Sequence, residues 1–230
     1  MGTSCILELV KPVWKRGSRS EDSGSLSLVG CALRVNSGEK AVRAGRLDPG
    51  TEIPGTGGAT VGDFWAWAYS EILTNTSRGI FAEFLIGNAL RVVEGVRPTG
   101  WEDFGLSYNG WKIEVEASAY MQNWHQNTPS IIRFDVGERG SWDSETNSWR
   151  PDPVRSADYC VFCLYAETNR SRANVLDTSK WEFYVLPIER IDHELGTQKS
   201  VGLSRTKSMT EPVDYGHQLK ERVDRVLSGA

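Results

Sequence analysis

Residues 103–116 read Asp-Phe-Gly-Leu-Ser-Tyr-Asn-Gly-Trp-Lys-Ile-Glu-Val-Glu, and they decide which fold the chain can adopt. Asn109-Gly110 stands between two runs of alternating apolar and polar residues. This is the strongest short-range signal of a β-hairpin, because a type I′ turn needs positive φ at both central residues. In such a hairpin the facing pairs are Tyr108 with Trp111, Leu106 with Ile113, and Phe104 with Val115. All of these apolar side chains fall on one face, which supports this register.

The opposite face of the predicted hairpin is acidic. The same register places Gly105 opposite Glu114 and Asp103 opposite Glu116. Like charges directly opposed across two strands are destabilising unless something compensates them. Mg²⁺ binds hard oxygen ligands, so Asp103, Glu114 and the Val115 carbonyl are candidate ligands of a divalent cation. The alternative is an acidic face that water solvates.

A further carboxylate, Glu83, falls in a predicted helix for which Asn75 or Ser77 is the expected cap. Its neighbours at three- and four-residue spacing carry no opposite charge; they are Gly79, Ile80, Ile86 and Gly87. We therefore predict that Glu83 points inward. It either joins the metal cluster or accepts a buried hydrogen bond, because buried acids are rarely left unpaired.

Composition divides the chain near residue 60. Residues 48–60 are dense in Gly and Pro without periodicity, which is typical of a linker or an exposed loop. We predict an N-terminal segment over 1–60, whose fold the sequence leaves open, and one domain over 61–230. Its expected elements are helices from 61 and from 77, strands at 104–108, 111–118, 131–136, 159–166 and 182–187, a short helix at 120–126, and a final helix from 214.

The overall composition, with a net charge of −4 and 24% charged residues, is that of a soluble globular protein. No run approaches the roughly 18 apolar residues of a membrane-spanning helix, and the N-terminus lacks the pattern of a signal peptide. We therefore expect no membrane partner and a cytoplasmic location. Cys160 and Cys163 lack the second cysteine or histidine pair of a tetrahedral metal site, so we predict reduced thiols in a buried strand.

Taken together, Arg78-Gly-Ile-Phe-Ala-Glu83, Asp103 and the strand Ile113-Glu-Val-Glu116 resemble the PD-(D/E)xK, or restriction-endonuclease-like, nuclease superfamily. The likeness covers about residues 62–227. It implies an α/β fold with a central mixed β-sheet flanked by helices. It further implies that Asp103 and Glu114 bind Mg²⁺ or Mn²⁺, and that Glu83 assists them.

The chain departs from this family at Glu116, where lysine is usual. A carboxylate cannot supply the positive charge that stabilises the transition state. Glu116 is expected to act as a base or as a ligand of a second cation, and the alternative is that catalysis has been lost. Lys112 lies on the same strand face as Glu114 and is either a substitute cation or a solvated charge.

Two further residues, Gln122 and Trp124, follow the catalytic strand directly. The Gln122 amide is a candidate to hold the attacking water or a phosphate, with packing in the core as the alternative. Trp124 is expected to pack into the core rather than to stack on a base.

The function implied by the resemblance is hydrolysis of phosphodiester bonds in nucleic acid. DNA is favoured over RNA only by analogy of fold. The alternative is an inactive, nuclease-derived module that binds nucleic acid or another partner, and a third reading is a purely structural subunit. A second copy of the chain, forming a homodimer, is left open as a further partner.

Overall fold

The computed structural model describes residues 45–95, 97, 104–143 and 148–229, which belong to one compact unit, Arg43–Ala230. Residues 1–44 and Asp103 lie outside the described ranges, and the domain boundary near residue 60 stays a prediction. Residues 48–60 form a loop that an isolated β-bridge between Glu52 and Thr60 closes.

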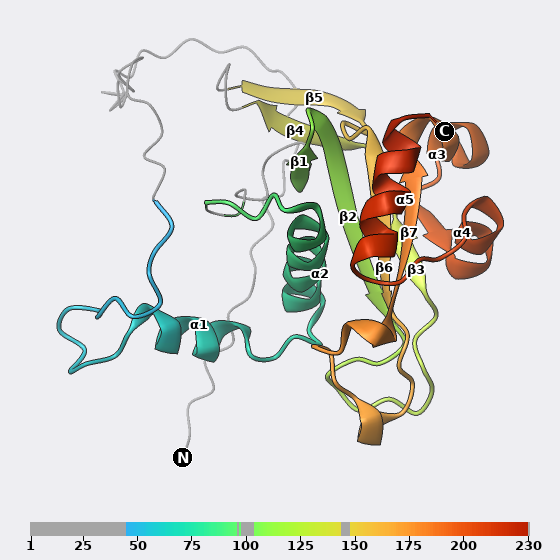
Figure 1. Cartoon of the computed structure of the whole chain (residues 1–230). Helices are drawn as coiled ribbons and strands as arrows, with labels where there is room; N and C mark the ends of the chain where they lie inside the picture. The colour runs from blue at the N-terminus through green and yellow to red at the C-terminus, as the bar shows by residue number, and fades with distance from the viewer. Residues whose placement is uncertain (1–44, 96, 98–103, 144–147, 230) are drawn as a thin grey trace, which may run out of the picture. The chain divides into compact units, whose positions relative to one another are not determined.

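The centre of this unit is a mixed β-sheet of four strands in the order β1-β2-β6-β7 (Figure 1). These strands are β1 (Leu106–Tyr108), β2 (Trp111–Ala119), β6 (Tyr159–Tyr165) and β7 (Trp181–Pro187). β2 pairs in parallel with β6, and the other neighbours are antiparallel. The predicted α/β class with a mixed sheet flanked by helices is confirmed.

The hairpin between β1 and β2 has the register predicted from the sequence. Leu106 pairs with Ile113 and Tyr108 with Trp111. The ladder begins at Leu106, so the predicted strand start at 104 and the predicted pairing of Phe104 with Val115 are wrong. Asn109 and Gly110 take φ of 52° and 84°, as a type I′ turn requires. The turn fixes the register of the hairpin, and the register fixes which β2 side chains share a face, independently of the other strands.

One face of the sheet is covered by α2 (Asn75–Leu90) and α5 (His217–Leu227). Thr74 caps α2 by accepting a hydrogen bond from the Ser77 backbone, so the caps predicted at Asn75 and Ser77 are wrong by one and three residues. α5 begins three residues after Asp214, because Gly216 takes a φ of 91° that ends the preceding turn.

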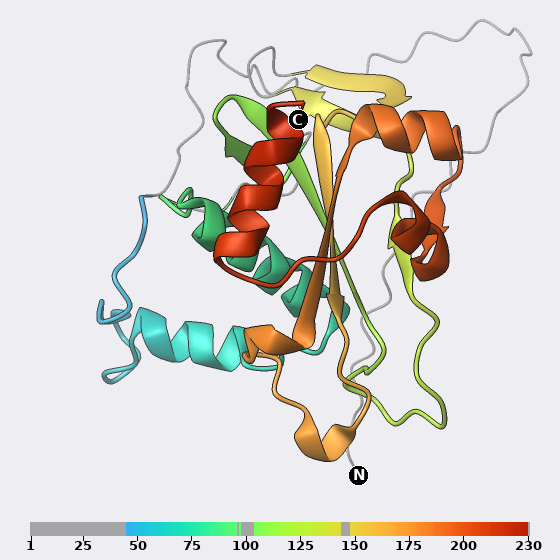
Figure 2. The ribbon, with the colours of Figure 1, turned by 45° about the vertical axis from the view of Figure 1, so that its right-hand side comes forward.

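The opposite face packs against α3 (Ile188–Leu195), α4 (Leu203–Met209) and the small sheet of β3 (Arg133–Asp135) and β8 (Ser200–Gly202). Figure 2 shows the central strands between α2 and α5 on one side and α3 and α4 on the other. The sheet is therefore the middle of three layers.

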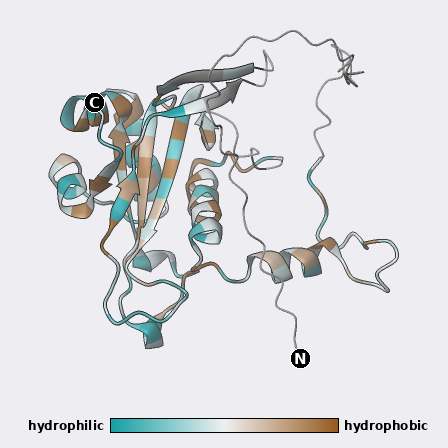
Figure 3. Ribbon diagram, turned by 180° about the vertical axis from the view of Figure 1, so that it is seen from behind, coloured by the Kyte–Doolittle hydropathy of each residue, from teal (hydrophilic) through white to brown (hydrophobic). Residues whose placement is uncertain are grey.

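Strand β6 is buried along its whole length, as expected for a central strand covered on both faces. Its thiols confirm the prediction of reduced core cysteines: Cys163 faces the α2 side and Cys160 the opposite side. Figure 3 shows polar and apolar bands alternating along neighbouring strands of the sheet. Burial of β6 leaves its neighbour β2 to supply the polar groups of the sheet.

The remaining elements lie around this core. They are α1 (Val61–Tyr69), β4 (Arg139–Asp143) paired with β5 (Ser148–Val154), and the 3-10 helices η1 (Arg170–Arg172) and η2 (Thr178–Lys180). The helix predicted from residue 61 is present as α1, but Phe64 and Tyr69, two of its apolar residues at helical spacing, are 48% and 47% exposed.

The short helix predicted at 120–126 is wrong. These residues form an irregular loop in which the Gln126 side chain takes over backbone hydrogen bonding. Gln126 Oε1 accepts from the Gln122 backbone N–H at 2.6 Å, and its Nε2 donates to Ser130 Oγ at 2.9 Å. These side-chain bonds compete with helical backbone pairing.

Candidate functional site

The candidate site lies on the polar face of β2. Glu114 and Glu116 are two residues apart on this strand, so their side chains leave the same face of the sheet. Across the parallel ladder they are level with Cys160 and Phe162 of β6. Their side chains are 31% and 20% exposed, so both carboxylates are partly removed from water.

The guanidinium of Arg139, at the start of β4, faces these carboxylates. Its Nη2 lies 3.0 Å from Glu116 Oε1 and 3.1 Å from Asp135 Oδ2, and its Nη1 lies 3.6 Å from Glu114 Oε1. Arg139 thus contacts three carboxylates, and the charge of Arg97 also interacts with that of Glu114. Sequence reasoning missed Arg139 and Asp135, because both follow β2 by some twenty residues and no local pattern links them to it.

The pKa values follow from this burial. Burial raises the pKa of Glu116 from 4.5 to about 7, although the charge of Arg139 lowers it, and the charge of Glu114 raises it further. Burial also raises the pKa of Glu114, which the charge of Arg139 lowers and that of Glu83 raises. The negative charge of the cluster is therefore only partly compensated, and Glu116 can exchange a proton near neutral pH.

Glu83 approaches the same region from α2. Its side chain is 15% exposed and accepts two hydrogen bonds of 2.6 Å from Arg97, one to Oε2 from Nε and one to Oε1 from Nη2. A Cβ placed at Gly105 would lie 3.6 Å from Glu83 Cδ, and a backbone hydrogen bond from Gly105 lowers the pKa of Glu114. The missing side chain at Gly105 therefore leaves the space through which Glu83 and Glu114 approach each other.

The structure describes only some of the metal ligands expected from the sequence, because Asp103 lies outside the described residues. Within the described ranges, histidine, cysteine and carboxylate side chains form no group of three or more that could hold a metal ion as they stand. Glu114 and Glu116 nevertheless carry carboxylate oxygens, which are the hard ligands that Mg²⁺ and Mn²⁺ prefer. Burial raises the pKa values of Glu114 and Glu116, and Arg139 offsets this only in part, so a divalent cation beside these two carboxylates would stabilise their charged forms.

Lys112 does not join the carboxylates by an ion pair with any described residue. Its Nζ lies over the Phe104 ring, 5.2 Å from the centroid, in a cation–π contact. The cation nearest to Glu116 is therefore Arg139, from a different strand.

Gln122 belongs to a second group of polar side chains. It is 6% exposed; its Oε1 accepts from Arg78 Nη1 at 3.1 Å, and its Nε2 donates to the Ala119 carbonyl at 3.0 Å and to Ser130 Oγ at 3.2 Å. These bonds occupy its amide group. The structure thus gives Gln122 a role in holding the loop after β2.

Trp124, in the same loop, is 53% exposed, so the expectation that it packs into the core is wrong. The cause is the irregular path of the loop, which carries Trp124 outward where a helix would have turned it towards the sheet.

Comparison of the chain with protein-family models, with curated proteins and with solved structures found no match. Among the residues that the structure describes, no helix combines the length and apolar character that crossing a lipid bilayer requires.

Proposed function

We propose that this chain is a metal-dependent nuclease of the restriction-endonuclease-like type, which hydrolyses phosphodiester bonds in DNA. The observation that carries the proposal is the pair Glu114 and Glu116 on one face of β2, partly buried and with raised pKa values. A solvated acidic surface would not raise them, because water would screen the charges.

In this proposal different residues bind the metal and accept the proton. Asp103 and Glu114 would hold Mg²⁺ or Mn²⁺, with Glu83 and the Val115 carbonyl as additional oxygen donors. The cation would supply Lewis-acid polarisation of the phosphate and a more acidic bound water. Glu116, whose pKa is about 7, is placed to accept the proton of an attacking water at its carboxylate.

Arg139 takes the part for which lysine is usual in this superfamily. The guanidinium stays protonated at all relevant pH values and lies 3.0 Å from Glu116. A planar guanidinium binds phosphate oxygens with paired hydrogen bonds, so it can stabilise the charge that develops on phosphorus oxygens. The positive charge missing at position 116 is thereby supplied from β4.

The test is incubation of supercoiled, linear and single-stranded DNA, and of RNA, with Mg²⁺ or Mn²⁺ against an EDTA control. We expect metal-dependent cleavage that Glu114→Gln abolishes. Glu221→Gln is the matched control, because it makes the same chemical change at a 56% exposed site on α5. Cleavage that persists in EDTA, or in Glu114→Gln, would contradict the proposal.

A second candidate is an inactive nuclease-derived module that binds nucleic acid. It is favoured by one observation: Arg139 already contacts the carboxylates that a metal would use. Under this reading the wild-type chain binds DNA but does not cleave it with either metal.

A further inference from the structure

Gln122 is contacted by an arginine that has no carboxylate partner among the described residues. Arg78, on α2, is 4% exposed. Its Nη1 donates to the Leu73 carbonyl at 3.0 Å and to Gln122 at 3.1 Å, its Nη2 donates to Asn75 Oδ1 at 2.7 Å, and its buried Nε has no hydrogen-bond partner. Burial lowers the pKa of Arg78, but a guanidinium stays charged in proteins. A buried positive charge without an anion is unfavourable.

A second arginine, Arg170 on η1, reaches the same residue from the opposite side of the loop. Its Nη2 donates to the carbonyls of Gln122, at 3.0 Å, and Trp124. Within the described part of the chain its Nε and Nη1 make no hydrogen bond and it has no carboxylate partner. Its neighbour Arg172, by contrast, pairs with Glu167 at 3.2 Å. Arg170 is thus held in place by backbone oxygens and keeps donors free.

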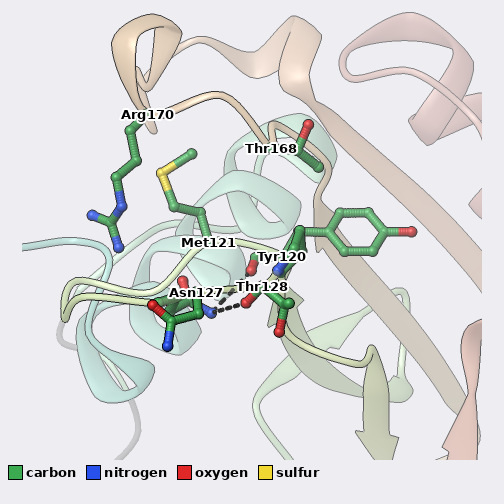
Figure 4. A pocket seen from close by; sticks show the side chains of 8 residues that line it. Tyr120, Met121, Asn127, Thr128, Thr168 and Arg170 are labelled. Atoms are coloured by element: carbon green, nitrogen blue, oxygen red, sulfur yellow. Dashed lines mark hydrogen bonds between the residues drawn. The ribbon is translucent and has the colours of Figure 1, made fainter.

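Arg170 borders a pocket of about 190 Å³ (Figure 4). Its polar lining includes Asn127, Thr128, Thr168 and Arg170, and its apolar lining includes Met121 and Pro129. Among the described residues that line the pocket, none is a carboxylate and Arg170 carries the charge. The volume is below the roughly 300–1,000 Å³ of pockets for drug-sized ligands, and suits a small anionic group.

We propose that this pocket is a phosphate-binding subsite, which takes a phosphodiester group of a nucleic-acid strand whose reacting bond lies at the β2 carboxylates. Guanidinium, hydroxyl and amide groups are the usual side-chain donors to nucleic-acid phosphates. A bound phosphate balances the charge of Arg170, which has no carboxylate partner in the described part of the chain. This inference rests on the proposed nuclease function for the identity of the strand.

The path between the two sites runs along β2. Glu116 lies on this strand and Tyr120, which lines the pocket, follows its last residue directly. Both lie on the side of the sheet that packs against Phe162. Four residues of extended chain span about 13 Å, so a strand that reaches both sites would run along β2. The exposed Trp124 beside Arg170 offers a ring on which a base can stack.

The experiment measures binding of a fluorescein-labelled single-stranded DNA oligonucleotide by anisotropy, in EDTA so that no cleavage occurs, over a series of salt concentrations. We expect Arg170→Gln to weaken binding about tenfold and to reduce the slope of log K against log salt by about 0.7, the value for one phosphate contact on a single strand. Arg172→Gln is the matched control. It removes the same charge two residues further along the chain, but from a guanidinium that is already paired with Glu167.

Because Arg170 also holds the loop, Thr128→Val and Thr168→Val supply a second test that leaves its backbone contacts in place. Each is expected to weaken binding two- to fivefold without a change in melting temperature of more than about 2 °C. The subsite is overturned if Arg170→Gln and both threonine variants bind like wild type, or if the oligonucleotide does not bind at all.

The two proposals fail separately. If the wild type does not cleave with Mg²⁺ or Mn²⁺ but binding depends on Arg170, the nuclease proposal fails and the subsite stands. If cleavage requires Glu114 while Arg170→Gln binds and cleaves like wild type, the subsite fails and the nuclease proposal stands. Inorganic phosphate, added as a competitor, is expected to displace the strand from wild type more readily than from Arg170→Gln.

Discussion

At Glu116, burial raises the pKa of the carboxyl to about 7 although Arg139 Nη2 is 3.0 Å away. The loss of hydration thus outweighs the ion pair, which remains half in water because Arg139 is 57% exposed. A carboxyl with this pKa is divided between its two protonation states near neutral pH. This is the condition under which a general base works best.

Glu116→Gln is predicted to remove a pH dependence of stability. The folded pKa lies above the unfolded value, so this group's stabilisation is complete below pH 4.5 and is lost as pH rises through about 7. The free energy of unfolding of the variant, relative to that of wild type, should therefore increase between pH 5 and pH 8. The increase is at most about 3 kcal/mol, at about 1.4 kcal/mol per pH unit. Urea unfolding at pH 5, 6, 7 and 8 measures this, and a difference that does not change with pH would contradict it.

Arg139→Gln is predicted to lower metal-dependent cleavage by about 10²-fold, because it removes the cation nearest to the reacting group. Arg139→Lys should retain part of the activity, since it keeps the charge but not the paired donors. The measured quantity is the cleavage rate at saturating DNA. Arg133→Gln, at an exposed position of β3, is the control and should leave this rate unchanged; equal rates in all variants would remove Arg139 from the mechanism.

At the scale of elements, the β1–β2 hairpin shapes the candidate site, because its first strand begins at Leu106 and leaves Gly105 outside the ladder. At Gly105 the ladder has ended and there is no side chain, so Glu83 of α2 can approach Glu114 of β2 past the edge of the sheet. Asn-Gly turns and alternation are short-range signals, which is why this hairpin was predictable from the sequence. The approach of α2 to the end of β2 was not predictable from the sequence, because it depends on how the face of α2 packs against the sheet.

Gly105→Leu is predicted to destabilise the fold by about 1–3 kcal/mol, because its side chain must displace Glu83. Gly105→Ala should be tolerated, since the nearest atom would lie 3.6 Å from its Cβ, an ordinary contact. Urea midpoints measure both. Gly79→Leu on α2, where a Cβ meets nothing within 4 Å, is the matched control, and equal losses at positions 79 and 105 would refute the steric argument.

Other elements were missed for identifiable reasons. α3 carries apolar residues at Ile188, Ile191 and Leu195, a helical spacing that could have been recognised, but it follows β7 without a loop. β8 has three residues and pairs with β3, so its strand character depends on a partner distant in the sequence. Short strands of this kind carry too little periodicity to be predicted alone.

For the whole molecule, divalent metal is predicted to raise the melting temperature, because a cation that binds the folded carboxylates stabilises the folded state by mass action. At a concentration of about 100 Kd the rise should be roughly 5 °C or more. Alanine at Asp103 or Glu114 should abolish it, and Glu221→Ala should not. Differential scanning calorimetry with Mg²⁺, Mn²⁺ and EDTA measures the shift; an equal rise in every variant would place the metal elsewhere.

The three-layer packing predicts that both core thiols are unreactive until the domain unfolds. Cys160 and Cys163 lie on opposite faces of β6, and burial raises both thiol pKa values well above 9, so little thiolate forms. In a variant with Cys5 and Cys31 replaced by serine, Ellman's reagent should react only after denaturation. Reaction within minutes under native conditions would show that one of the two helical layers opens.

Local sequence alone determined the hairpin, its register, the shared face of Glu114 and Glu116, and the buried strand β6. A two-residue turn and a period of two act over neighbouring residues, so they hold whatever the remaining chain does.

Tertiary structure alone decided which charges meet. Arg139 and Asp135 reach β2 from the segment that follows it, and Arg78 and Arg170 converge on Gln122 from α2 and η1. Such pairings depend on how helices and strands distant in sequence pack across the sheet. Burial within the fold raises the pKa of Glu116, which the charge of Arg139 lowers only in part. The contacts of Arg170 with the carbonyls of Gln122 and Trp124 likewise depend on packing across the fold rather than on residue type.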